Sequence, residues 1–426
     1  MASVQPFEGT RYNPEHVKLG GVLAPPYDVI SDEQRDELYG RDMRNIVRVD
    51  YGVRYPSDVE GVDDSYTRAA SFLESWLDLG ILVRDHPPGY YVVDHHFPDP
   101  NGGVRVRRGL LATVAATSWE RSDLRPHERT LRGPKLDRLA LMRATRAQTS
   151  PVFGLWQGGG DIAAHLEHAA TGSALLGGRI DGEVGSEKLL LWRVADAAHV
   201  AAIAGALRDA SLYIADGHHR YETAAAYADE RRAATPDASP DAPFERCLVY
   251  LAAAEDPGIT ILPTHRLVRP RPGVAFSLDD LWARLDDSFE TEPAADGTSA
   301  LATAAALRAT HHAFAVVARD GAAVLSKPRR TGGSPRDNLD VVVLESEVLG
   351  PAGVSSEAIA GGALRYTRDA ASLDASVQRG EAVLGFGVTP VTTGEVIAVA
   401  AAGETMPQKS TYFYPKVPTG LVLFEV

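Results

Sequence analysis

Cysteine is almost absent from this sequence, which has 426 residues and a single thiol, Cys247. One cysteine excludes an internal disulfide, and its position inside the apolar run 247–251 predicts a buried thiol rather than a nucleophile. Long apolar runs are absent as well, because no stretch approaches the roughly 18 apolar residues of a membrane span. Residues 1–11 lack the basic start and apolar stretch of a signal peptide. We therefore expect a cytoplasmic protein without a membrane partner.

Positive charge is scarce relative to negative charge. The chain has 43 Lys and Arg against 57 Asp and Glu, which gives a net charge of -14 and a pI near 5.4. Such a surface opposes non-specific attraction to DNA, RNA or anionic membranes, so we expect no nucleic-acid partner. Any anionic ligand must instead be held by a local basic pocket. The composition, 44% hydrophobic and 23% charged, is typical of a globular protein with about two or three domains.

The order of the expected elements predicts a mixed α/β fold. Residues 1–135 form an N-terminal α+β lobe, residues 136–330 a central α/β region, and residues 331–426 a C-terminal α/β segment packed back on the core. We expect strands at 45–51, 89–97, 104–115, 151–156, 188–194, 212–215 and 259–262. Helices are expected at 31–39, 65–79, from 136 onward, and at 162–170, 197–207, 221–232 and 300–309.

Residues 216–220, Asp-Gly-His-His-Arg, lie between an apolar strand-like run and a helix-like run. A turn that enters a helix points backbone N–H groups and the positive end of the helix dipole at one place, which suits a phosphate or a carboxylate. Gly217 permits the tight turn, and Arg220 can grip an oxyanion with two parallel hydrogen bonds. Asp216 can hold magnesium or accept a proton. The alternative is that Asp216 caps the helix and the histidines are ordinary turn residues.

A second group of cations surrounds the helix expected from residue 136. His127 lies in a Pro-punctuated loop before it, and helical spacing predicts that Lys135, Arg138 and Arg146 project together. The loop favours a pocket wall, whereas solvated helix charges are the alternative. His265, after the expected strand at 259–262, is a further candidate; its alternative is a structural hydrogen-bonding pair with the next residue.

The segment 403–416 near the C-terminus is rich in polar and aromatic side chains. Three aromatic residues would not be left in water, so the segment is expected to fold back onto the body. A capping box at Thr392 and Glu395 predicts a helix before it. Gln408, Lys409 and Ser410 would then leave a loop behind a fixed element. A packed C-terminal strand is the alternative, supported by the apolar run 421–424.

Four sequence blocks resemble the domain of unknown function 1015 family: 24–31 (APPYDVIS), 125–130 (RPHERT), 215–224 (ADGHHRYETA) and 406–413 (MPQKSTYF). The resemblance spans nearly the whole chain, and the family label carries no established activity. The central block also resembles the Asp-Gly-His-His-Arg loop of the free serine kinases related to ParB and sulfiredoxin. This second resemblance implies a ParB/sulfiredoxin-like core in which the loop opens a helix and cradles nucleotide phosphates.

The resemblance implies a phosphotransferase that acts on free serine or O-phosphoserine, with ADP or ATP as co-substrate and Mg²⁺ as cofactor. The loop amides and nearby cations would hold phosphate oxygens, Asp216 would anchor magnesium, and His218 would contact the moving phosphoryl group. No residue of this sequence could be matched to the catalytic glutamate of the free serine kinases. Glu128, Asp28 and Asp216 are therefore the candidates for the general base. The predicted catalytic residues are Asp216, His218 and Glu128, and the predicted binding residues are Gly217, His219, Arg220, His127, Lys135, Arg138, His265, Gln408, Lys409 and Ser410.

Two other functions stay open from the sequence. A phosphomonoester hydrolase would use water in place of the nucleotide and would release phosphate from a substrate such as phosphoserine. A regulator in the manner of ParB would bind CTP or ATP without turnover and change its partner contacts. The sequence does not determine the substrate's carbon skeleton, the nucleotide base, the reaction direction or the oligomeric state.

Overall fold

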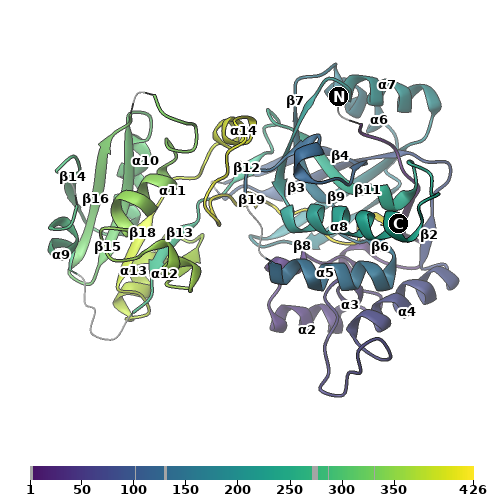
Figure 1. Ribbon diagram of the computed structural model, residues 1–426, viewed down its shortest axis with the longest axis horizontal. Helices are drawn as coiled ribbons and strands as arrows, with labels where there is room; N and C mark the ends of the chain where they lie inside the picture. Colours follow the sequence, from purple (N-terminus) through teal and green to yellow (C-terminus); the bar gives the residue numbers. More distant parts are fainter. Residues whose placement is uncertain (1–2, 101, 129–131, 271–276, 286, 331) are drawn as a thin grey trace. The chain divides into compact units, whose positions relative to one another are not determined.

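The protein is described by a computed structural model that covers residues 3–100, 102–128, 132–270, 277–285, 287–330 and 332–426. Its fold is mixed α/β with several sheets, as predicted (Figure 1). The chain separates into two compact units. The first unit comprises Met1–Pro126, Thr130–Thr260 and Pro415–Val426, and the second comprises His127–Arg129 and Ile261–Tyr414.

These units differ from the three sequential segments, 1–135, 136–330 and 331–426, that the sequence analysis expected. The reason is that the last residues of the chain return to the first unit. The C-terminal strand β20 (Leu423–Glu425) pairs with β1 (Gly9–Tyr12) and with β6 (Ala147–Gln148). With β2 (Leu82–Arg84) they form a four-stranded antiparallel sheet. Backbone pairing between distant segments leaves no signal in the local sequence pattern.

The core of the first unit is an eight-stranded sheet with the order β5-β10-β7-β11-β4-β3-β9-β8. The pairs β5–β10 and β7–β11 are parallel, and the other neighbours are antiparallel. The strands are β3 (Tyr90–Pro98), β4 (Val104–Ala115), β5 (Leu124–Arg125), β7 (Val152–Gln157), β8 (Leu176–Asp181), β9 (Ser186–Val194), β10 (Ser211–Asp216) and β11 (Arg246–Ala253). Five of them match expected strands; β5, β8 and β11 were not expected.

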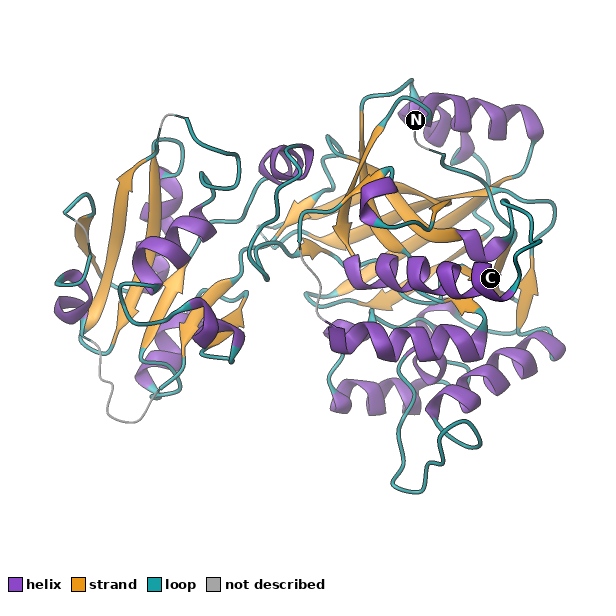
Figure 2. Cartoon of the chain, viewed as in Figure 1, coloured by secondary structure: helices purple, strands orange, loops and turns teal. Residues whose placement is uncertain are grey.

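Helices cover this sheet in layers. Figures 1 and 2 show α8 against the sheet, α5 packed on α8, and α4 packed on α5. Apolar residues of α5, α6, α7 and α8 share one core with the sheet, because each helix is apolar on the side that it buries. The helices of this unit are α1 (Leu19–Val22), the 3₁₀ turn η1 (Tyr27–Val29), α2 (Asp32–Arg41), α3 (Val47–Asp50), α4 (Ser65–Asp78), η2 (Trp119–Arg121), α5 (Arg132–Thr145), α6 (Ile162–Ala169), α7 (Ala197–Leu207), α8 (His218–Ala234) and η3 (Pro243–Glu245).

The strand expected at 45–51 is wrong, because α3 occupies this segment. Asn45 explains the turn into the helix: its side-chain oxygen accepts the Val47 N–H at 3.0 Å. The Asn45 amide also donates to the carbonyls of Gly21 and Leu23, at 2.7 and 3.1 Å. These contacts with a distant segment outweigh the β-propensity of the valines at 47 and 49. The capping box expected at Ser31 is confirmed at the start of α2.

The second unit has a six-stranded sheet with the order β14-β16-β15-β18-β13-β17. Side chains alternate along β15: Ala313, Ala315 and Val317 face α10 and α13, whereas Phe314 and Val316 face a second apolar cluster. The strands are β13 (His265–Val268), β14 (Glu290–Ala294), β15 (His311–Ala318), β16 (Gly321–Pro328), β17 (Leu364–Thr367) and β18 (Leu384–Gly387), and β12 (Thr260–Ile261) pairs with β19 (Phe413–Tyr414) in a two-stranded sheet. The helices are α9 (Leu278–Trp282), α10 (Gly297–Leu307), α11 (Asp340–Val343), the π-helical turn η4 (Leu344–Leu349), α12 (Ser356–Ala360), α13 (Ala371–Gln378) and α14 (Thr393–Ala401).

Two expectations for this unit have clear outcomes. The capping box at Thr392 and Glu395 is confirmed at the start of α14. His265 was expected to follow the end of a strand, but it begins β13, whose four residues are all buried.

Within the described part of the chain, no helix combines the length and the apolar character needed to cross a membrane.

Candidate functional site

The predicted strand–turn–helix at 216–220 is present. β10 ends at Asp216, α8 begins at His218, and Gly217 between them has a left-handed backbone with φ of 92°. A Cβ atom at this glycine would lie 2.9 Å from the Arg220 guanidinium, so a larger residue would displace that side chain. Gly217 is the N-cap, and no side chain caps the helix. The alternative in which Asp216 caps α8 is therefore wrong.

The Asp216 carboxylate lies between two cations. Its Oδ2 accepts from Arg220 at 2.6 Å, and its Oδ1 accepts from Lys416 Nζ at 2.6 Å. Burial alone would raise the pKa of Asp216, but the charges of Lys416 and Arg220 outweigh it and lower the pKa to about 2. A carboxylate that is ionised and doubly paired is a poor proton acceptor at neutral pH. The structure therefore argues against Asp216 as the general base.

The Arg220 guanidinium is fixed by protein groups on both of its terminal nitrogens. One nitrogen bonds to Asp216, and the other donates to Ser150 Oγ at 2.9 Å and to the Pro151 carbonyl. Burial alone would lower the pKa of Arg220, but Asp216 and then Asp28 raise it overall. From the sequence, the Arg220 guanidinium was expected to bind an oxyanion of the ligand. In the structure its direction is set by protein acceptors instead, and an incoming anion has to compete with them.

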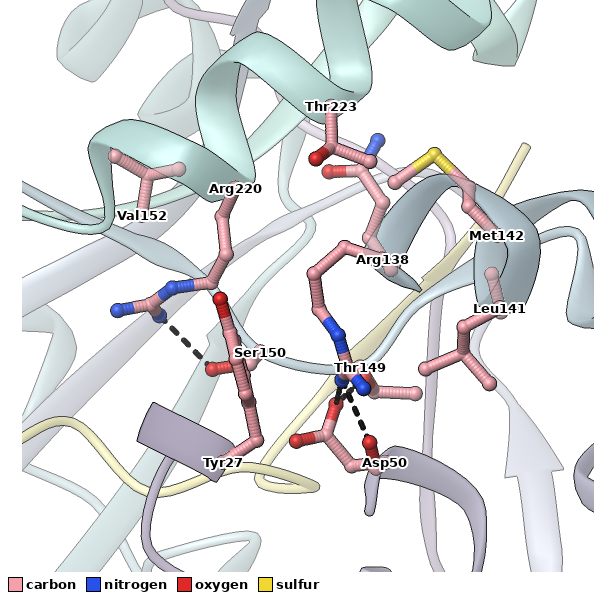
Figure 3. A pocket seen from close by; sticks show the side chains of 12 residues that line it. Tyr27, Asp50, Arg138, Leu141, Met142, Thr149, Ser150, Val152, Arg220 and Thr223 are labelled. Atoms are coloured by element: carbon pink, nitrogen blue, oxygen red, sulfur yellow. Dashed lines mark hydrogen bonds and ion pairs between the residues drawn. The ribbon is translucent and has the colours of Figure 1, made fainter. Parts of the chain in front are cut away.

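Arg220 reaches a small cavity of about 40 Å³, which has room for about three water molecules. Figure 3 shows Tyr27, from the APPYDVIS block, between the side chains of Arg220 and Arg138. The Arg138 guanidinium lies 4.1 Å from the centre of the Tyr27 ring, which is a close cation–π contact. The cavity is lined by Tyr27, Asp50, Arg138, Leu141, Met142, Ala147, Gln148, Thr149, Ser150, Val152, Arg220 and Thr223.

Asp50 is a functional candidate that the sequence analysis missed. It is only 4% exposed, and its Oδ1 accepts from Thr149 at 2.7 Å and from Arg138 at 3.4 Å. Its Oδ2 is buried without a hydrogen-bond partner in the protein. The sequence did show a single acidic residue, Asp50, within the segment Val47–Tyr51. Because a strand was expected there, the position of Asp50 at the end of a short helix was not recognised.

A larger pocket of about 570 Å³ shares four residues with the small cavity, namely Tyr27, Asp50, Arg138 and Leu141. Helices α2, α3, α4 and α5 supply most of its walls. Its full lining is Tyr27, Asp32, Arg35, Val49, Asp50, Tyr51, Gly52, Arg54, Ser65, Tyr66, Asp137, Arg138 and Leu141. Of this set only Arg138 was a predicted site residue.

The first turn of α8 packs against Trp119, which the sequence analysis did not single out. The indole ring stacks on Tyr221 at 4.5 Å and lies 6.4 Å from the His218 ring. Its N–H donates to Glu222 at 2.8 Å. His218 is 6% exposed, whereas His219 is half-buried. The first of the two histidines is thus part of a packed aromatic group.

The cations of α5 do not project together as predicted. Lys135 lies 3.5 Å from Glu222 of α8, whereas Arg138 points to Asp50 and Asp137. Arg146 lies beyond the end of α5 and has φ of 49°, so it is not on the helix. The prediction failed because α5 ends at Thr145 and its two faces meet different neighbours, α8 and α4.

Five predicted residues of the second unit lie in two segments, 127–128 and 408–410, that contact each other. The Met406 N–H donates to the His127 carbonyl at 2.7 Å, and the Lys409 N–H donates to Glu128 Oε1 at 2.8 Å. The His127 ring bonds to Thr411 at 3.1 Å. Ser410 is buried and donates to the Pro407 carbonyl at 2.6 Å, while Gln408 is exposed. The blocks RPHERT and MPQKSTYF are therefore in contact; Arg129 and Thr130 of the first block lie outside the described residues.

His265 does not lie in this group. Its ring is buried in β13, and Nδ1 accepts the Val388 N–H at 3.2 Å. Burial, followed by the Arg266 charge, lowers the pKa of His265 to about 4, so the ring is neutral at pH 7. The hydrogen-bond partner of His265 is thus the Val388 backbone and not the neighbouring Arg266.

A magnesium ion does not fit directly on Asp216 as the side chains are arranged. Both carboxylate oxygens already bind cations, and a divalent ion placed there would meet two positive charges. Among the residues that the structure describes, no cluster of three or more His, Cys, Asp or Glu side chains has the geometry to hold a metal ion.

Comparison with known proteins gives structural neighbours of low similarity. No curated protein matches the chain. A conserved hypothetical protein from Pyrococcus furiosus has 13% identity and a TM-score of 0.36, over 72% of this chain and 93% of the other. A free serine kinase in complex with AMP has 12% identity and a TM-score of 0.37, over 73% and 92%. SbnI with a C-terminal truncation, from Staphylococcus aureus, has 12% identity and a TM-score of 0.32, over 72% and 85%.

One family model covers most of the chain. It matches residues 4–342, a span that contains three of the four blocks noted in the sequence and reaches into both compact units. The chain therefore belongs to the family described as Protein of unknown function (DUF1015).

Proposed function

We propose that this protein is a phosphotransferase that moves a phosphoryl group between a nucleotide, ADP or ATP, and a small hydroxylated metabolite, namely free serine or O-phosphoserine. The proposal is supported by the resemblance of residues 216–220 to the loop of the free serine kinases. It is supported further by the presence of that loop at the start of a 17-residue helix, next to a small cavity that Asp50, Arg138 and Ser150 help to line.

The observation that carries the proposal is the arrangement of two cations on one carboxylate at the N-terminus of α8. Arg220 and Lys416 both bind Asp216, and Asp28 and Asp50 also act on Arg220. The helix dipole, together with these two cations, favours an anion at this place. A phosphate group is the anion that best matches a helix N-terminus with arginine and lysine beside it.

The proposed chemistry consists of positioning and charge neutralisation. Arg220, Lys416 and the α8 N-terminus would stabilise the charge on the phosphoryl oxygens, and His218 would contact the transferred group. Asp216 would keep the two cations oriented. Asp28, which acts on Arg220, is the proposed general base at this site, because Asp216 is doubly paired. Gly217, His219, Lys135 and Arg138 remain proposed binding residues of the first unit, and His127, Glu128, Gln408, Lys409 and Ser410 remain proposed functional residues of the second unit.

The test is an activity assay with the purified full-length protein. Serine with ATP should give phosphoserine and ADP, and phosphoserine with ADP should give the reverse reaction; both are followed by phosphorus NMR. Arg220→Ala should lower turnover by about 100-fold or more, because it removes a preorganised charge at the phosphoryl group. Asp28→Asn should lower the turnover number with little change in nucleotide affinity. Arg208→Ala, an exposed arginine at the end of α7, is the matched control and should retain activity.

Three other results would contradict the phosphotransferase proposal. Release of phosphate from phosphoserine without nucleotide would indicate a phosphomonoester hydrolase. Nucleotide binding that changes the oligomer size without turnover would indicate a regulator. An Arg220→Ala variant that folds, as judged by circular dichroism, and turns over at the wild-type rate would remove the role of the α8 site.

A further inference from the structure

The pocket of about 570 Å³ in the first unit has the size and lining of a site for a planar polar ligand. Small-molecule pockets commonly span about 300 to 1,000 Å³. This one is formed by α2, α3, α4 and α5 rather than by the 216–220 loop, and it meets the small cavity at Asp50 and Arg138. A ligand could therefore extend from this pocket toward Arg220.

Three arginines and three tyrosines line this pocket. Three arginines each lie over one tyrosine ring, and such flat cationic and aromatic surfaces favour the stacking of a nucleobase. The guanidinium–ring distances are 5.5 Å for Arg35 and Tyr51, 5.7 Å for Arg54 and Tyr66, and 4.1 Å for Arg138 and Tyr27.

Hydrogen bonds to aspartates hold two of these tyrosines in place. The Tyr66 hydroxyl donates to Asp137 at 2.8 Å, and the Tyr51 hydroxyl donates to Asp32 at 3.3 Å. Side chains that are already ordered lose little conformational entropy when a ligand stacks on them. The walls of the pocket are thus preorganised for an aromatic ligand.

Asp50, at the boundary between the pocket and the small cavity, lacks one hydrogen bond. Thr149 and Arg138 fix its Oδ1, whereas Oδ2 has no partner in the protein. A buried carboxylate oxygen without a donor is costly, and a hydroxyl group of a ligand would satisfy it. Acidic side chains bind ribose hydroxyls in this way. Because Oδ2 is closed to solvent, the contact requires a movement of a lining side chain such as Tyr27.

We propose that this pocket binds the nucleoside part of a nucleotide, with a ribose hydroxyl donating to Asp50 Oδ2 and the phosphates directed past Arg138 toward Arg220. The inference rests on the proposed function in taking ADP or ATP as co-substrate. It adds that the N-terminal helices recognise the base and the sugar, which assigns a role to Asp50 and to the three arginine–tyrosine pairs.

The test compares ADP with 2′,3′-dideoxy-ADP, which has the same charge and base but lacks both ribose hydroxyls. Isothermal titration calorimetry on the full-length wild type should show dideoxy-ADP binding about 10- to 100-fold more weakly, the value of a hydrogen bond to a charged group. Asp50→Asn should bind the two nucleotides with similar affinity, because the charged acceptor is gone. Asp78→Asn is the matched control, since it removes the charge of an exposed aspartate at the end of α4 that lines neither cavity; it should discriminate like the wild type.

The wild-type comparison needs no variant, so it decides the question even if Asp50→Asn fails to fold. Equal affinity of the wild type for ADP and dideoxy-ADP would overturn this inference, and turnover of serine with ATP in the same preparation would leave the proposed function standing. Retained discrimination in a folded Asp50→Asn protein would also overturn it, because the hydroxyls would then bind elsewhere. Absence of any ADP binding would overturn both.

Discussion

Asp216 and Lys416 form an ion pair of 2.6 Å between positions that lie 200 residues apart in the sequence. The pair exists because the C-terminal segment returns to the first unit. The Gly420 N–H donates to the Thr149 carbonyl at 2.9 Å, and the Thr419 N–H donates to the Ala24 carbonyl at 2.8 Å. The same segment thus reaches three parts of the candidate site, namely the APPYDVIS block, the link between β6 and β7, and the end of β10.

Replacing Lys416 should destabilise the protein strongly. Lys416→Met leaves Asp216 buried with one cation instead of two, and breaking a buried pair costs about 3 to 5 kcal/mol. The free energy of unfolding, measured by urea denaturation of the full chain, should fall by this order. Adding Asp216→Asn to Lys416→Met should not restore the stability, because the buried Arg220 then loses its carboxylate partner. Lys18→Met, which removes an exposed lysine, should change stability by less than about 0.5 kcal/mol.

The low pKa of Asp216 predicts how stability depends on pH. The carboxyl has a pKa of about 2 in the folded protein and of about 3.9 when unfolded, so its contribution is fully present above pH of about 4 to 5. As pH falls toward 2 the unfolded state binds the proton first, and about 2 to 3 kcal/mol is lost. The contribution of the Asp216 carboxylate is the difference between the free energies of unfolding of the wild type and of Asp216→Asn, measured in urea between pH 6 and pH 2. Parallel pH curves for the two proteins would contradict it.

Gly217→Ala should disturb the candidate site more than the fold. The left-handed backbone costs an alanine about 1 to 2 kcal/mol, and the new Cβ would lie 2.9 Å from the Arg220 guanidinium. Gly103→Ala is the matched control, because Gly103 has φ of 87° and nothing within 4 Å of a Cβ. Both variants should lose similar stability in thermal unfolding, but only Gly217→Ala should weaken ADP binding. Equal ADP affinity for the two variants would show that the displacement of Arg220 has no effect on the ligand.

The local elements of the fold were largely predictable from the sequence. The strand–turn–helix at 216–220 and the capping boxes at Ser31 and Thr392 depend on neighbouring residues, and all three are present. The helix at α3 was not predictable, because Asn45 fixes it through a contact with residues 21 and 23. The β-propensity of the valines at 47 and 49 predicted a strand, but tertiary contacts stabilise a helix there instead.

The partners of the candidate side chains were the least predictable part. The residue types at 216–220 indicated that the loop binds an anion. The neighbouring sequence did not predict that Lys416 pairs with Asp216 or that Ser150 accepts a hydrogen bond from Arg220. Asp50 was missed for the same reason, since its neighbours Arg138 and Thr149 come from α5 and from the link between β6 and β7. A carboxylate's role depends on which charges face it, and only the folded chain determines that.

The rate at which a reagent labels the Cys247 thiol reports how often the core around β11 opens. The thiol is 1% exposed in β11, and burial raises its pKa to about 12, although Arg220 and Arg246 oppose that shift. The reactive thiolate forms only as the pH rises toward the pKa, so at pH 8 almost none exists in the folded state. In the unfolded chain a thiol pKa near 8.5 makes the thiolate abundant at the same pH.

Native protein should therefore resist iodoacetamide at pH 8, and protein in 8 M urea should react completely at the one site, as mass spectrometry would show. The slow labelling that remains in the native state measures opening of the sheet around β11. A ligand that binds only the folded protein suppresses that opening, by about 100-fold when it is present at about 100 times its dissociation constant. ADP should thus slow the labelling of Cys247 in the wild type and much less in Arg220→Ala. Rapid labelling of the native wild type would show that β11 is not the closed core strand described above.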